Sequence, residues 1–359
     1  MSDAVRIVRD APLTHRNTFG VAARAPLLAE VADTRVLPDV LARDGFAGNS
    51  PLLVGGGSNL LFAGDPDVPV LALTGDAVSV VSDDGTEVVL RAEAGANWHG
   101  FVKDTLARGL GGLENLSLIP GTVGAAPIQN IGAYGVEVCE RIHAVEAFEP
   151  AAGTWHRLPA RDCAFGYRDS LFKRQPDRFI VTAVEFTLSR DAEVRVGYAG
   201  LDDAFAAAGH AAPTPRQVAD AVIAIRRSKL PDPAVLGNAG SFFKNPIVPA
   251  AQAEALREAH PRLPVFPVAP FPADALAHGE APHGPRSKLS AAWLIDGCGW
   301  KGHRRGDAGV AASHALVLVN HGHATGAELL ELARDIAASV QDRFGVALEP
   351  EPRVVGARW

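Results

Sequence analysis

The chain has 359 residues, which is too long for one ordinary hydrophobic core, so we expect two or three domains. Apolar residues make up 47% and charged residues 21% of the sequence, as is usual for a soluble globular protein, and the formal net charge of −7 argues against a general nucleic-acid-binding protein, which usually presents a basic face. Cys139, Cys163 and Cys298 form no CxxC pair, so no disulfide framework and no metal site is expected. No apolar run approaches the length of a membrane span, and residues 1–10 carry charges where a signal peptide is apolar, so the expected location is the cytoplasm.

The first part of the sequence alternates short strands with a helix. Apolar runs bounded by turn residues predict strands. Apolar residues at helical spacing, followed by Gly109, predict a helix that ends near Arg108. The expected elements are strands over 51–54, 68–73, 87–92 and 178–187 and a helix over 98–108.

A domain boundary is expected where Pro231-Asp-Pro233 ends a helix over 217–227. Beyond it, the clearest helix has Thr325 and Glu328 in the spacing of a capping box. The stretch 261–285 is rich in proline, alanine, glycine and histidine and is expected to be a long surface excursion. Strands mixed with crossover helices predict an α+β protein. The other expected elements are helices over 289–295 and 327–344 and a strand over 315–320.

Two glycine-rich loops have the composition of phosphate-binding turns. Gly55-Gly-Gly-Ser-Asn59 follows a predicted strand, so its amides can converge on an anion, although a plain tight turn explains this loop equally well. It matches neither the Walker nor the Rossmann pattern. The second loop, residues 119–135, carries four glycines and almost no charge, and loops this long and apolar usually lie against a ligand. Together the loops predict a cofactor without naming it.

The ten residues Gly237-Asn-Ala-Gly-Ser-Phe-Phe-Lys-Asn-Pro246 surround one hydroxyl, that of Ser241. The two glycines that precede it allow a ligand to approach the backbone, and Lys244 and Asn245 place a cation and an amide beside it. The Gly-x-Ser-x-Gly pattern of hydrolases is absent, so Ser241 is not expected to be a nucleophile of that kind. A capped turn would leave the polar cluster unexplained, and we expect a ligand-binding loop.

Five motifs, in order along nearly the whole chain, resemble those of the UDP-N-acetylenolpyruvoylglucosamine reductase family, type I branch. The resemblance implies a two-subdomain FAD-binding fold of the vanillyl-alcohol oxidase/para-cresol methylhydroxylase type, followed by a C-terminal α+β substrate-binding domain. The implied domains are residues 1–72 with the tail 350–359, residues 73–228, and residues 229–349. The motifs are Asn17-Thr-Phe-Gly20, Pro127 to Gly135, Gly166-Tyr-Arg-Asp-Ser170, Gly237 to Pro246 and Leu348-Glu-Pro-Glu-Pro-Arg353.

The resemblance also implies a reaction. NADPH would reduce a non-covalently held FAD, and UDP-N-acetylglucosamine enolpyruvate would then be reduced to UDP-N-acetylmuramate for peptidoglycan synthesis. Hydride would pass from flavin N5 to the terminal carbon of the enolpyruvyl group, and Ser241 would protonate the adjacent carbon. The implied partners are this substrate and NADPH, with no nucleic acid, membrane or obligate protein partner.

Such a reduction needs cations or hydrogen-bond donors on the substrate carboxylate and a proton source. From chemistry alone, Arg168 is as readily a surface arginine as a carboxylate clamp, and Glu351 is as readily an exposed acid as a donor to the enolate. The resemblance assigns both residues to catalysis, together with Ser241. Pro352 departs from the family, which usually has an aliphatic residue there.

The remaining site residues are also implied by the resemblance. Tyr198 matches a tyrosine that covers the substrate in the type I branch. The implied substrate-binding residues are Tyr167, Tyr198, Arg226, Lys229, Lys244 and Asn245. The implied cofactor-binding residues are Gly55, Gly56, Gly57, Ser58, Asn59, Pro120, Gly121, Thr122, Gly124, Gln129, Asn130, Gly132, Ala133, Tyr134 and Arg353. The alternatives are an FAD-dependent oxidase or dehydrogenase of the same fold acting on an alcohol or sugar, and a flavin- or nucleotide-sugar-binding protein without catalysis.

Overall fold

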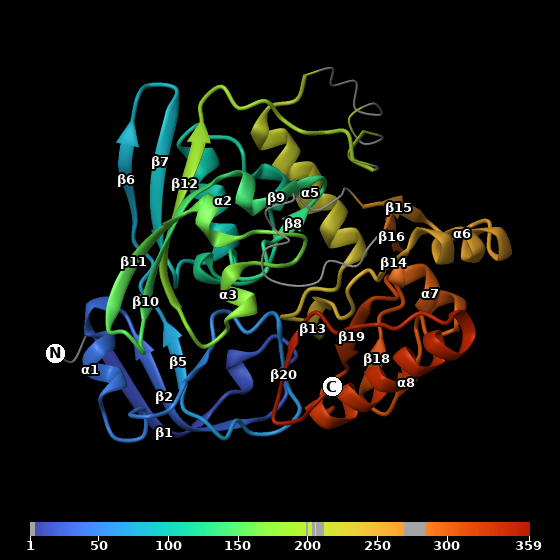
Figure 1. Cartoon of the computed structure of the whole chain (residues 1–359), viewed down its shortest axis with the longest axis horizontal. Helices are drawn as coiled ribbons and strands as arrows, with labels where there is room; N and C mark the ends of the chain where they lie inside the picture. Colours follow the sequence, from blue (N-terminus) through green and yellow to red (C-terminus); the bar gives the residue numbers. More distant parts are fainter. Residues whose placement is uncertain (1–3, 199, 203–204, 206–211, 269–283) are drawn as a thin grey trace. The chain divides into compact units, whose positions relative to one another are not determined.

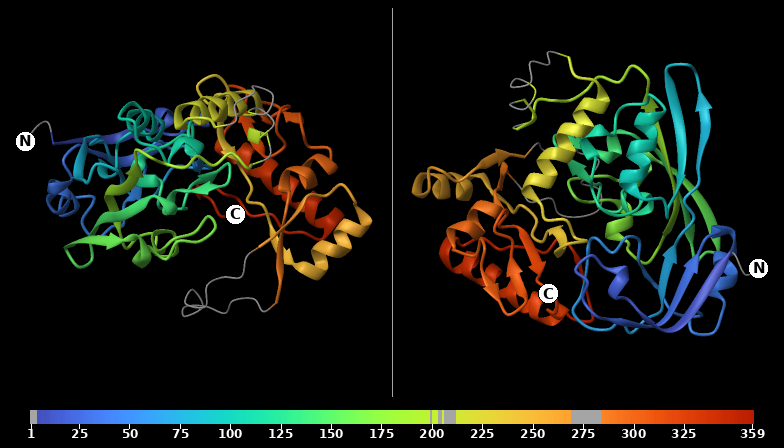
Figure 2. Two further views of the ribbon diagram at one scale, coloured as in Figure 1. Left: turned by 90° about the horizontal axis from the view of Figure 1, so that it is seen from above. Right: turned by 180° about the vertical axis from the view of Figure 1, so that it is seen from behind.

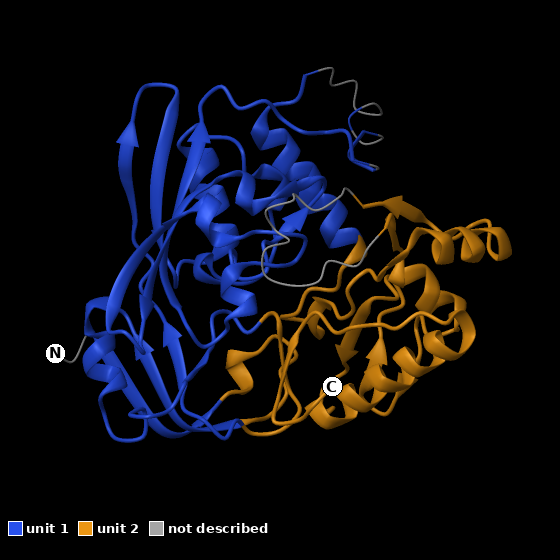
Figure 3. Cartoon of the chain, viewed as in Figure 1, with its two compact units in different colours: residues 1–12, 24–57, 66–228 blue, residues 13–23, 58–65, 229–359 orange. Residues whose placement is uncertain are grey.

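The structure is a computed structural model that describes residues 4–198, 200–202, 205, 212–268 and 284–359. The chain divides into two compact units (Figure 3). Because the chain leaves unit 1 twice before residue 66, unit 2 is assembled from three segments. Unit 1 comprises residues 1–12, 24–57 and 66–228, and unit 2 comprises residues 13–23, 58–65 and 229–359.

The first sheet of unit 1 has four strands in the order β1-β2-β5-β3 (Figure 1). β1 and β2 are antiparallel, whereas β5 is parallel to both of its neighbours. Ala29 and Leu71 of the sheet pack with Leu37 and Val40 of helix α1 in one buried cluster. The strands expected near residues 52 and 70 are confirmed as β3 and β5. The bounds are β1 Val5–Pro12, β2 Arg24–Val31, α1 Leu37–Leu41, β3 Leu52–Leu53 and β5 Val70–Leu73.

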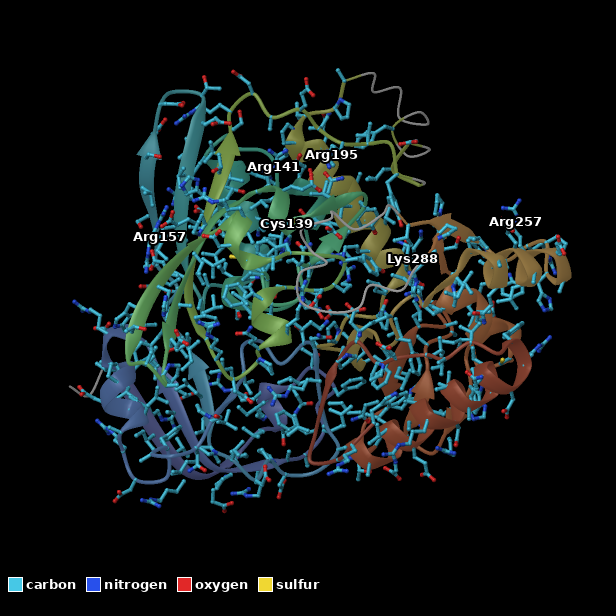
Figure 4. All side chains as sticks on the ribbon, viewed as in Figure 1. Cys139, Arg141, Arg157, Arg195, Arg257 and Lys288 are labelled. Atoms are coloured by element: carbon cyan, nitrogen blue, oxygen red, sulfur yellow. The ribbon has the colours of Figure 1, made fainter. Side chains whose placement is uncertain are left out.

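The second sheet of unit 1 has five antiparallel strands in the order β11-β10-β12-β7-β6, which lie side by side in Figures 1 and 2. β12 is buried along most of its length, and it includes Glu185, whose side chain is also buried. Arg157 of β11, labelled in Figure 4, donates two hydrogen bonds of 2.6 and 2.8 Å to this carboxylate, so the buried charge is paired. The strands expected near residues 87 and 178 are confirmed as β7 and β12. The bounds are β6 Val78–Asp83, β7 Glu87–Glu93, β10 Ile142–Glu149, β11 Thr154–Pro159 and β12 Ile180–Ser189.

Helix α2 of unit 1 forms at the expected place. The Asn97 side chain accepts a 2.8 Å hydrogen bond from the amide of Gly100 and caps the helix, and Gly109, at φ +75°, follows its end. Trp98 and Phe101 face the core of the five-stranded sheet. Helix α5 also confirms an expectation and is slightly longer than the sequence pattern indicated. The bounds are α2 Trp98–Ala107, β8 Gly132–Ala133, β9 Val136–Glu137, α3 Leu171–Arg174 and α5 Pro215–Lys229.

Unit 2 contains a four-stranded sheet in the order β13-β19-β18-β17, a three-stranded sheet in the order β14-β16-β15, and a parallel pair formed by β4 and β20. The buried strand expected near residue 317 is confirmed as β19. The bounds are β4 Leu60–Phe62, β13 Gly237–Ser241, β14 Ile247–Pro249, β15 Val265–Pro267, β16 Arg286–Leu289, β17 Arg304–Arg305, β18 Ala308–Val310, β19 Val317–Asn320 and β20 Arg353–Val355.

The helices of unit 2 are α6 Ala250–Ala259, α7 Ala291–Gly297 and α8 Gly326–Phe344. Both halves of the expected capping box of α8 are present, because the Thr325 hydroxyl accepts from the Glu328 amide while the Glu328 carboxylate accepts from the Thr325 amide. α7 begins two residues later than expected, since Leu289 is the last residue of β16. In the described ranges, no helix has the length and apolar character needed to cross a membrane.

Two expectations about chain organisation differ from the structure. Part of the supposed surface excursion 261–285 is regular, because β15 pairs with β16, and residues 269–283 of that stretch lie outside the described residues. The tail 350–359 was expected to accompany residues 1–72; its strand β20 does pair with β4, at residues 60–62, but both strands belong to unit 2, whereas most of residues 1–72 belong to unit 1. The chain passes from unit 1 to unit 2 between Ser228 and Lys229, at the residue where the substrate-binding domain was expected to begin.

Candidate functional site

Two glycine-rich loops of unit 1 lie against each other. A Cβ atom on Gly56 would lie 3.0 Å from the Cα of Gly121, and one on Gly55 would lie 2.6 Å from Oγ1 of Thr122. A side chain at either glycine would therefore push the loops apart. The close approach leaves the surface between them lined largely by backbone.

The backbone amides of these loops divide into two groups. Val123 and Gly124 donate to the carbonyl oxygens of Ala96 and Ala94, at 2.8 and 3.0 Å, and so hold the second loop in place. The second group donates to no acceptor in the part of the chain that the structure describes. It consists of the backbone amides of Gly55, Gly56, Gly121 and Thr122. Unpaired amides on converging loops form the kind of site that binds phosphate or pyrophosphate.

Three side-chain atoms of unit 1 are buried without a hydrogen-bond partner among the described residues, namely Oγ of Ser117, Nε of Arg141 and Nε of Arg226. Arg226 on α5 lies close enough to influence the pKa values of Tyr134 and His99, and burial lowers the pKa of its own guanidinium. Ser117 precedes Leu118, whose amide donates to Nδ1 of His99 at 3.0 Å. A buried guanidinium with an unpaired donor is costly, and an anionic ligand would satisfy it.

Asn130 has no exposed surface, and its side chain is used entirely within the protein. Nδ2 donates to Oε2 of Glu137 at 2.9 Å and to the carbonyl of Gly166 at 3.0 Å, while Oδ1 accepts from the amide of Cys139 at 3.0 Å. Both donors and the acceptor of the amide are therefore occupied. The side chain is not open to a cofactor, in contrast to what the resemblance implied.

Arg168 lies in a tight turn between Gly166 and Asp169, which exchange backbone hydrogen bonds of 3.0 and 3.1 Å. Its φ of +52° is uncommon for a residue with a side chain. The guanidinium donates to the carbonyl of Gly132 at 2.8 Å and lies 5.5 Å from the ring centroid of Tyr167. The turn therefore holds a planar cation in a fixed direction.

Tyr198 lies near the end of the second glycine-rich loop. Its ring is 5.6 Å from that of Tyr134, at an interplanar angle of 75°, and it is 49% exposed. Asn115 ties the two segments together, because its Nδ2 donates to the carbonyls of Tyr134 and Arg195 at 3.0 and 2.8 Å. Arg195, labelled in Figure 4, also pairs with Glu140 at 2.6 Å.

Backbone strain is concentrated in these segments of unit 1. Six described residues other than glycine have positive φ, and four of them lie in the second loop, directly before it or in the turn: Leu118, Asn130, Tyr134 and Arg168. Such conformations cost about 1–3 kcal/mol each and cluster at ligand-binding and active sites. The strain supports a functional rather than a purely connecting role.

Ser241 is the last residue of β13, directly after a bulge. The register between β13 and β19 shifts between Asn238 and Ser241, and the intervening Gly240 has φ +70°. Oδ1 of the buried Asn238 accepts from the Gly240 amide at 3.0 Å and holds the bulge. Ser241 is half-buried, and its hydroxyl makes no hydrogen bond among the described residues.

Residues 349–351 pair with residues 242–244 and bring Glu351 beside the Ser241 loop. The amide of Glu351 donates to the carbonyl of Phe242 at 2.8 Å, and a β-bridge joins the central residues of the two segments. This geometry is present with Pro352 in the sequence. The backbone segments that carry two of the three expected catalytic residues, Ser241 and Glu351, are therefore neighbours within unit 2, although 110 positions separate the two residues in the sequence (351 − 241).

The first glycine-rich loop continues into unit 2, which holds Ser58 and Asn59. Nδ2 of Asn59 donates to the carbonyl of Glu351 at 3.3 Å, and the carbonyl of Asn59 accepts from the amide of Arg353 at 3.0 Å. Arg353 has an exposed side chain at the start of β20. Asn59 therefore supports the backbone on both sides of Pro352.

Lys244 and Asn245 follow the Ser241 loop but differ in availability. Nζ of Lys244 pairs with Oε2 of Glu349 at 2.8 Å. Oδ1 of Asn245 accepts from the amide of Ala291, the first residue of α7, at 3.0 Å. The side-chain nitrogen Nδ2 of Asn245 donates to no group in the described ranges, so it remains open to a ligand.

His314 was not identified from the sequence. Burial, Lys229 and Lys301 all lower its pKa, so the histidine lies near both cations, and its Nδ1 accepts from the amide of Leu316 at 3.2 Å. The only sequence signal was a lone histidine before a buried strand, which is most often structural. Lys229 itself is exposed.

The residues of unit 1 fit a dinucleotide cofactor. Four unpaired amides suit a pyrophosphate, the close glycine contact leaves room for it, and the unpaired Nε of Arg226 offers a cationic donor. Among the described residues, no group of three or more His, Cys, Asp or Glu side chains is suited to holding a metal ion.

Comparisons with known proteins give a consistent result. A family model described as UDP-N-acetylenolpyruvoylglucosamine reductase, C-terminal domain, matches residues 232–355, and one described as FAD binding domain matches residues 39–159. The chain is 52% identical over 363 residues to the UDP-N-acetylenolpyruvoylglucosamine reductase of Xanthomonas axonopodis pv. citri (strain 306), with 100% of both chains covered. It is 53% identical over 350 residues to that of Xylella fastidiosa (strain M12), with 98% of this chain and 96% of the relative covered. The crystal structure of the enzyme from Thermus caldophilus is similar with a TM-score of 0.64 and 25% identity, over 98% of both chains.

Proposed function

Because the chain belongs to the UDP-N-acetylenolpyruvoylglucosamine reductase family, we propose that it reduces the enolpyruvyl ether of UDP-N-acetylglucosamine enolpyruvate to the lactyl ether of UDP-N-acetylmuramate, a peptidoglycan precursor. The observation that supports the proposal is the pairing of residues 349–351 with 242–244, which brings the backbone of Glu351 to that of Phe242, the residue after Ser241. Similarity to two relatives over essentially their whole length supports it.

FAD is the cofactor, and NADPH is the reductant. The amides of Gly55, Gly56, Gly121 and Thr122 would hold the pyrophosphate, with Arg226 as a cationic donor. When bound, FAD supplies the redox chemistry by taking two electrons from NADPH and passing a hydride equivalent to the substrate. Gly124 acts by close packing, because a Cβ there would lie 2.5 Å from that of Ala94.

The reaction adds a hydride equivalent to the terminal carbon and a proton to the carbon that bears the carboxylate. Arg168 binds the carboxylate, on which negative charge increases during the reaction. Glu351 hydrogen-bonds the developing enolate from its protonated form. Ser241 donates its hydroxyl proton to the adjacent carbon and is reprotonated from water, so one double bond is lost and one C–H bond forms at each carbon.

We assign the nucleotide part of the substrate to cations and an amide near Ser241. Lys229 and the free amide nitrogen of Asn245 are suited to a diphosphate, whereas Lys244 would first have to leave Glu349. The exposed ring of Tyr198 is suited to covering the bound substrate, and Tyr167 accompanies Arg168. The three free cysteines agree with a reducing, cytoplasmic location.

We further propose that residues 1–72 and 73–228 are the two FAD-binding subdomains and that residues 229–349 bind the substrate. The match of an FAD binding domain to residues 39–159 and the start of the C-terminal match at residue 232 support this division. The tail 350–359 contributes Glu351 to the substrate-binding part, since its segment pairs with residues 242–244.

The test is an anaerobic absorbance experiment. The purified protein, reconstituted with FAD, is reduced with NADPH and then mixed with UDP-N-acetylglucosamine enolpyruvate. The proposal requires that the flavin band disappear with NADPH and return with that substrate, with formation of UDP-N-acetylmuramate. A band that returned only with oxygen would instead support an oxidase of the same fold, and a protein that took up no FAD would contradict both functions.

A further inference from the structure

Asn130 stands out among the buried polar residues, because it joins three separate segments and none of its polar atoms is open to a ligand. Its amide links the loop that contains it to Glu137, to the amide of Cys139 and to the carbonyl of Gly166. Its own φ is +45°, so the backbone is also held in an unfavourable conformation. A residue that is strained and fully bonded serves to fix geometry.

The geometry that Asn130 fixes is that of the Arg168 turn. Gly166, which receives one N–H of Asn130, is the first residue of that turn. The Arg168 guanidinium then returns to the loop of Asn130, since it donates to the carbonyl of Gly132 at 2.8 Å and lies 3.5 Å from the carbonyl oxygen of Asn130. The turn and the loop are therefore joined at two points, namely the carbonyl of Gly166 and the guanidinium of Arg168.

Other contacts reinforce the same turn. The buried Ser170 donates from Oγ to the carbonyl of Ile128 at 2.6 Å, and Nζ of Lys173 donates to the carbonyl of Arg168 at 2.7 Å. A Cβ on Gly132 would lie 3.0 Å from Nη1 of Arg168 and 3.1 Å from the carbonyl oxygen of Val136, so a side chain there would displace the guanidinium. The guanidinium is thus enclosed by backbone on one side.

We propose that Asn130 is a positioning residue for the reduction: its side-chain amide sets the direction of the Arg168 guanidinium toward the substrate carboxylate. This inference rests on the proposed function, in which Arg168 binds that carboxylate. It differs from a cofactor contact, because both N–H groups and the oxygen of the amide are already bonded within unit 1.

The discriminating variant is Asn130→Asp, which keeps the size and oxygen of the side chain and removes the N–H donors. A carboxylate there would face the oxygens of Glu137 and Gly166, and the turn would lose its anchor. We expect FAD to remain bound and single-turnover reduction of the enolpyruvyl substrate to slow by about 10²-fold, since small misplacements of a catalytic group cost about that much.

A double-mutant cycle with Arg168→Ala separates positioning from general damage. If Asn130 acts through Arg168, Asn130→Asp slows the Arg168→Ala protein little further. If the two losses multiply, or if Asn130→Asp mainly releases FAD, the inference is overturned. Should Arg168→Ala itself leave substrate reduction unchanged, the proposed role of Arg168 fails, and that outcome is distinct from either of the others.

The matched control is Asn17→Asp in unit 2. Asn17 is also buried, donates to the carbonyls of Leu13 and Val21 at 2.9 and 3.0 Å, and accepts from the Val21 amide at 3.1 Å. Any slowing of substrate reduction that Asn17→Asp causes should multiply with the slowing caused by Arg168→Ala. Should Asn130→Asp fail to fold, Ser170→Ala takes its place in the cycle, because it removes one anchor of the turn. We expect Ser170→Ala to slow substrate reduction less than Asn130→Asp does, and to cause no further slowing in the Arg168→Ala protein.

Discussion

The Arg168 turn and the Ser241 bulge present their side chains in opposite ways. The guanidinium of Arg168 is bound to the carbonyl of Gly132, and the turn is anchored by Asn130. At Ser241 the protein fixes the backbone, through Asn238, and the hydroxyl makes no hydrogen bond among the described residues. A permanent charge can be oriented in advance, whereas a proton donor must be free to turn toward its acceptor. The difference matches the roles proposed for the two residues.

We expect the largest effect on substrate reduction from removing the proposed proton donor, because no other group can take its place. Ser241→Ala should slow the return of the flavin band with UDP-N-acetylglucosamine enolpyruvate by about 10³-fold, because general acid catalysis is lost. Reduction by NADPH should persist, since the proposed proton transfer belongs to the second half-reaction. Ser82→Ala, at an exposed serine of β6, serves as the control. A Ser241→Ala protein that turned over at the normal rate would remove Ser241 from the mechanism.

A smaller loss is expected from changing the shape of the held cation. Arg168→Lys keeps the charge but removes the planar fork, so steady-state assays should show a fall in kcat/KM for the enolpyruvyl substrate of about 10- to 100-fold. Arg174→Lys is the control, since Arg174 lies just beyond the same turn and pairs with Asp169 at 2.7 Å at the surface. Equal losses in both variants would mean that the turn, not the guanidinium, matters.

The glycine-rich loops are a third case, in which close packing of backbone against backbone, without a side chain, shapes the proposed binding site. In Gly56→Ala the new Cβ would lie 3.0 Å from the Cα of Gly121, and overpacking should weaken FAD binding by about 10-fold. Gly100→Ala in α2 is the control, because the three atoms nearest to its Cβ would all belong to the Asn97 side chain, at 3.4 Å or more. FAD titration followed by flavin fluorescence measures the difference, and equal affinities would argue against a pyrophosphate between these loops.

The smallest expected effect concerns pH. Burial first, then Lys103, Arg227 and Arg226, lower the pKa of His99 from its ordinary value of 6.5. The folded state therefore binds this proton less readily than the unfolded state, so the contribution to stability is complete above about pH 6.5 and decreases as the pH falls below it. Thermal unfolding between pH 7.5 and 5.5 should show a decrease in Tm.

The His99→Gln variant checks the origin of that decrease. It removes the titrating group, so Tm should depend less on pH over the same range. His143→Gln, at an exposed histidine of β10, should leave the pH dependence as it is in the unaltered protein. If His99→Gln and the unaltered protein showed the same slope, the proton uptake would belong to another group.

Local patterns allowed much of the fold to be predicted. Helix α8 was recognisable because its capping box, its apolar face and the glycine at its end all lie within about twenty consecutive residues. The end of α5 before Pro231 was similarly local. Ser241 could be identified because the unusual residues that surround it are its neighbours in sequence.

Contacts between distant segments could not be predicted in this way. Nothing local indicates that residues 349–351 pair with 242–244, or that Asn59 bonds the carbonyl of Glu351. From the sequence, an asparagine in a glycine-rich loop is predicted to contact a ligand. Only the burial of Asn130 and the bonds of its side-chain amide to Glu137 and Gly166 reveal that this amide is used within the protein. Likewise, the strand β15 inside a proline-rich stretch forms because β16 offers it a partner.

The three-part composition of unit 2 determines when this protein can finish folding. Its sheet and tail join residue 60 to residue 353 in the β4–β20 pair, with the intervening chain looping through unit 1. Pairings between such distant residues form slowly, because the entropy of closing the loop must be overcome first. During synthesis, residues 1–228 can therefore build unit 1 while segments 13–23 and 58–65 wait for their partners. The segment that follows Ser241 gains its pairing with residues 349–351 only after residue 351 has been synthesised, more than one hundred residues later.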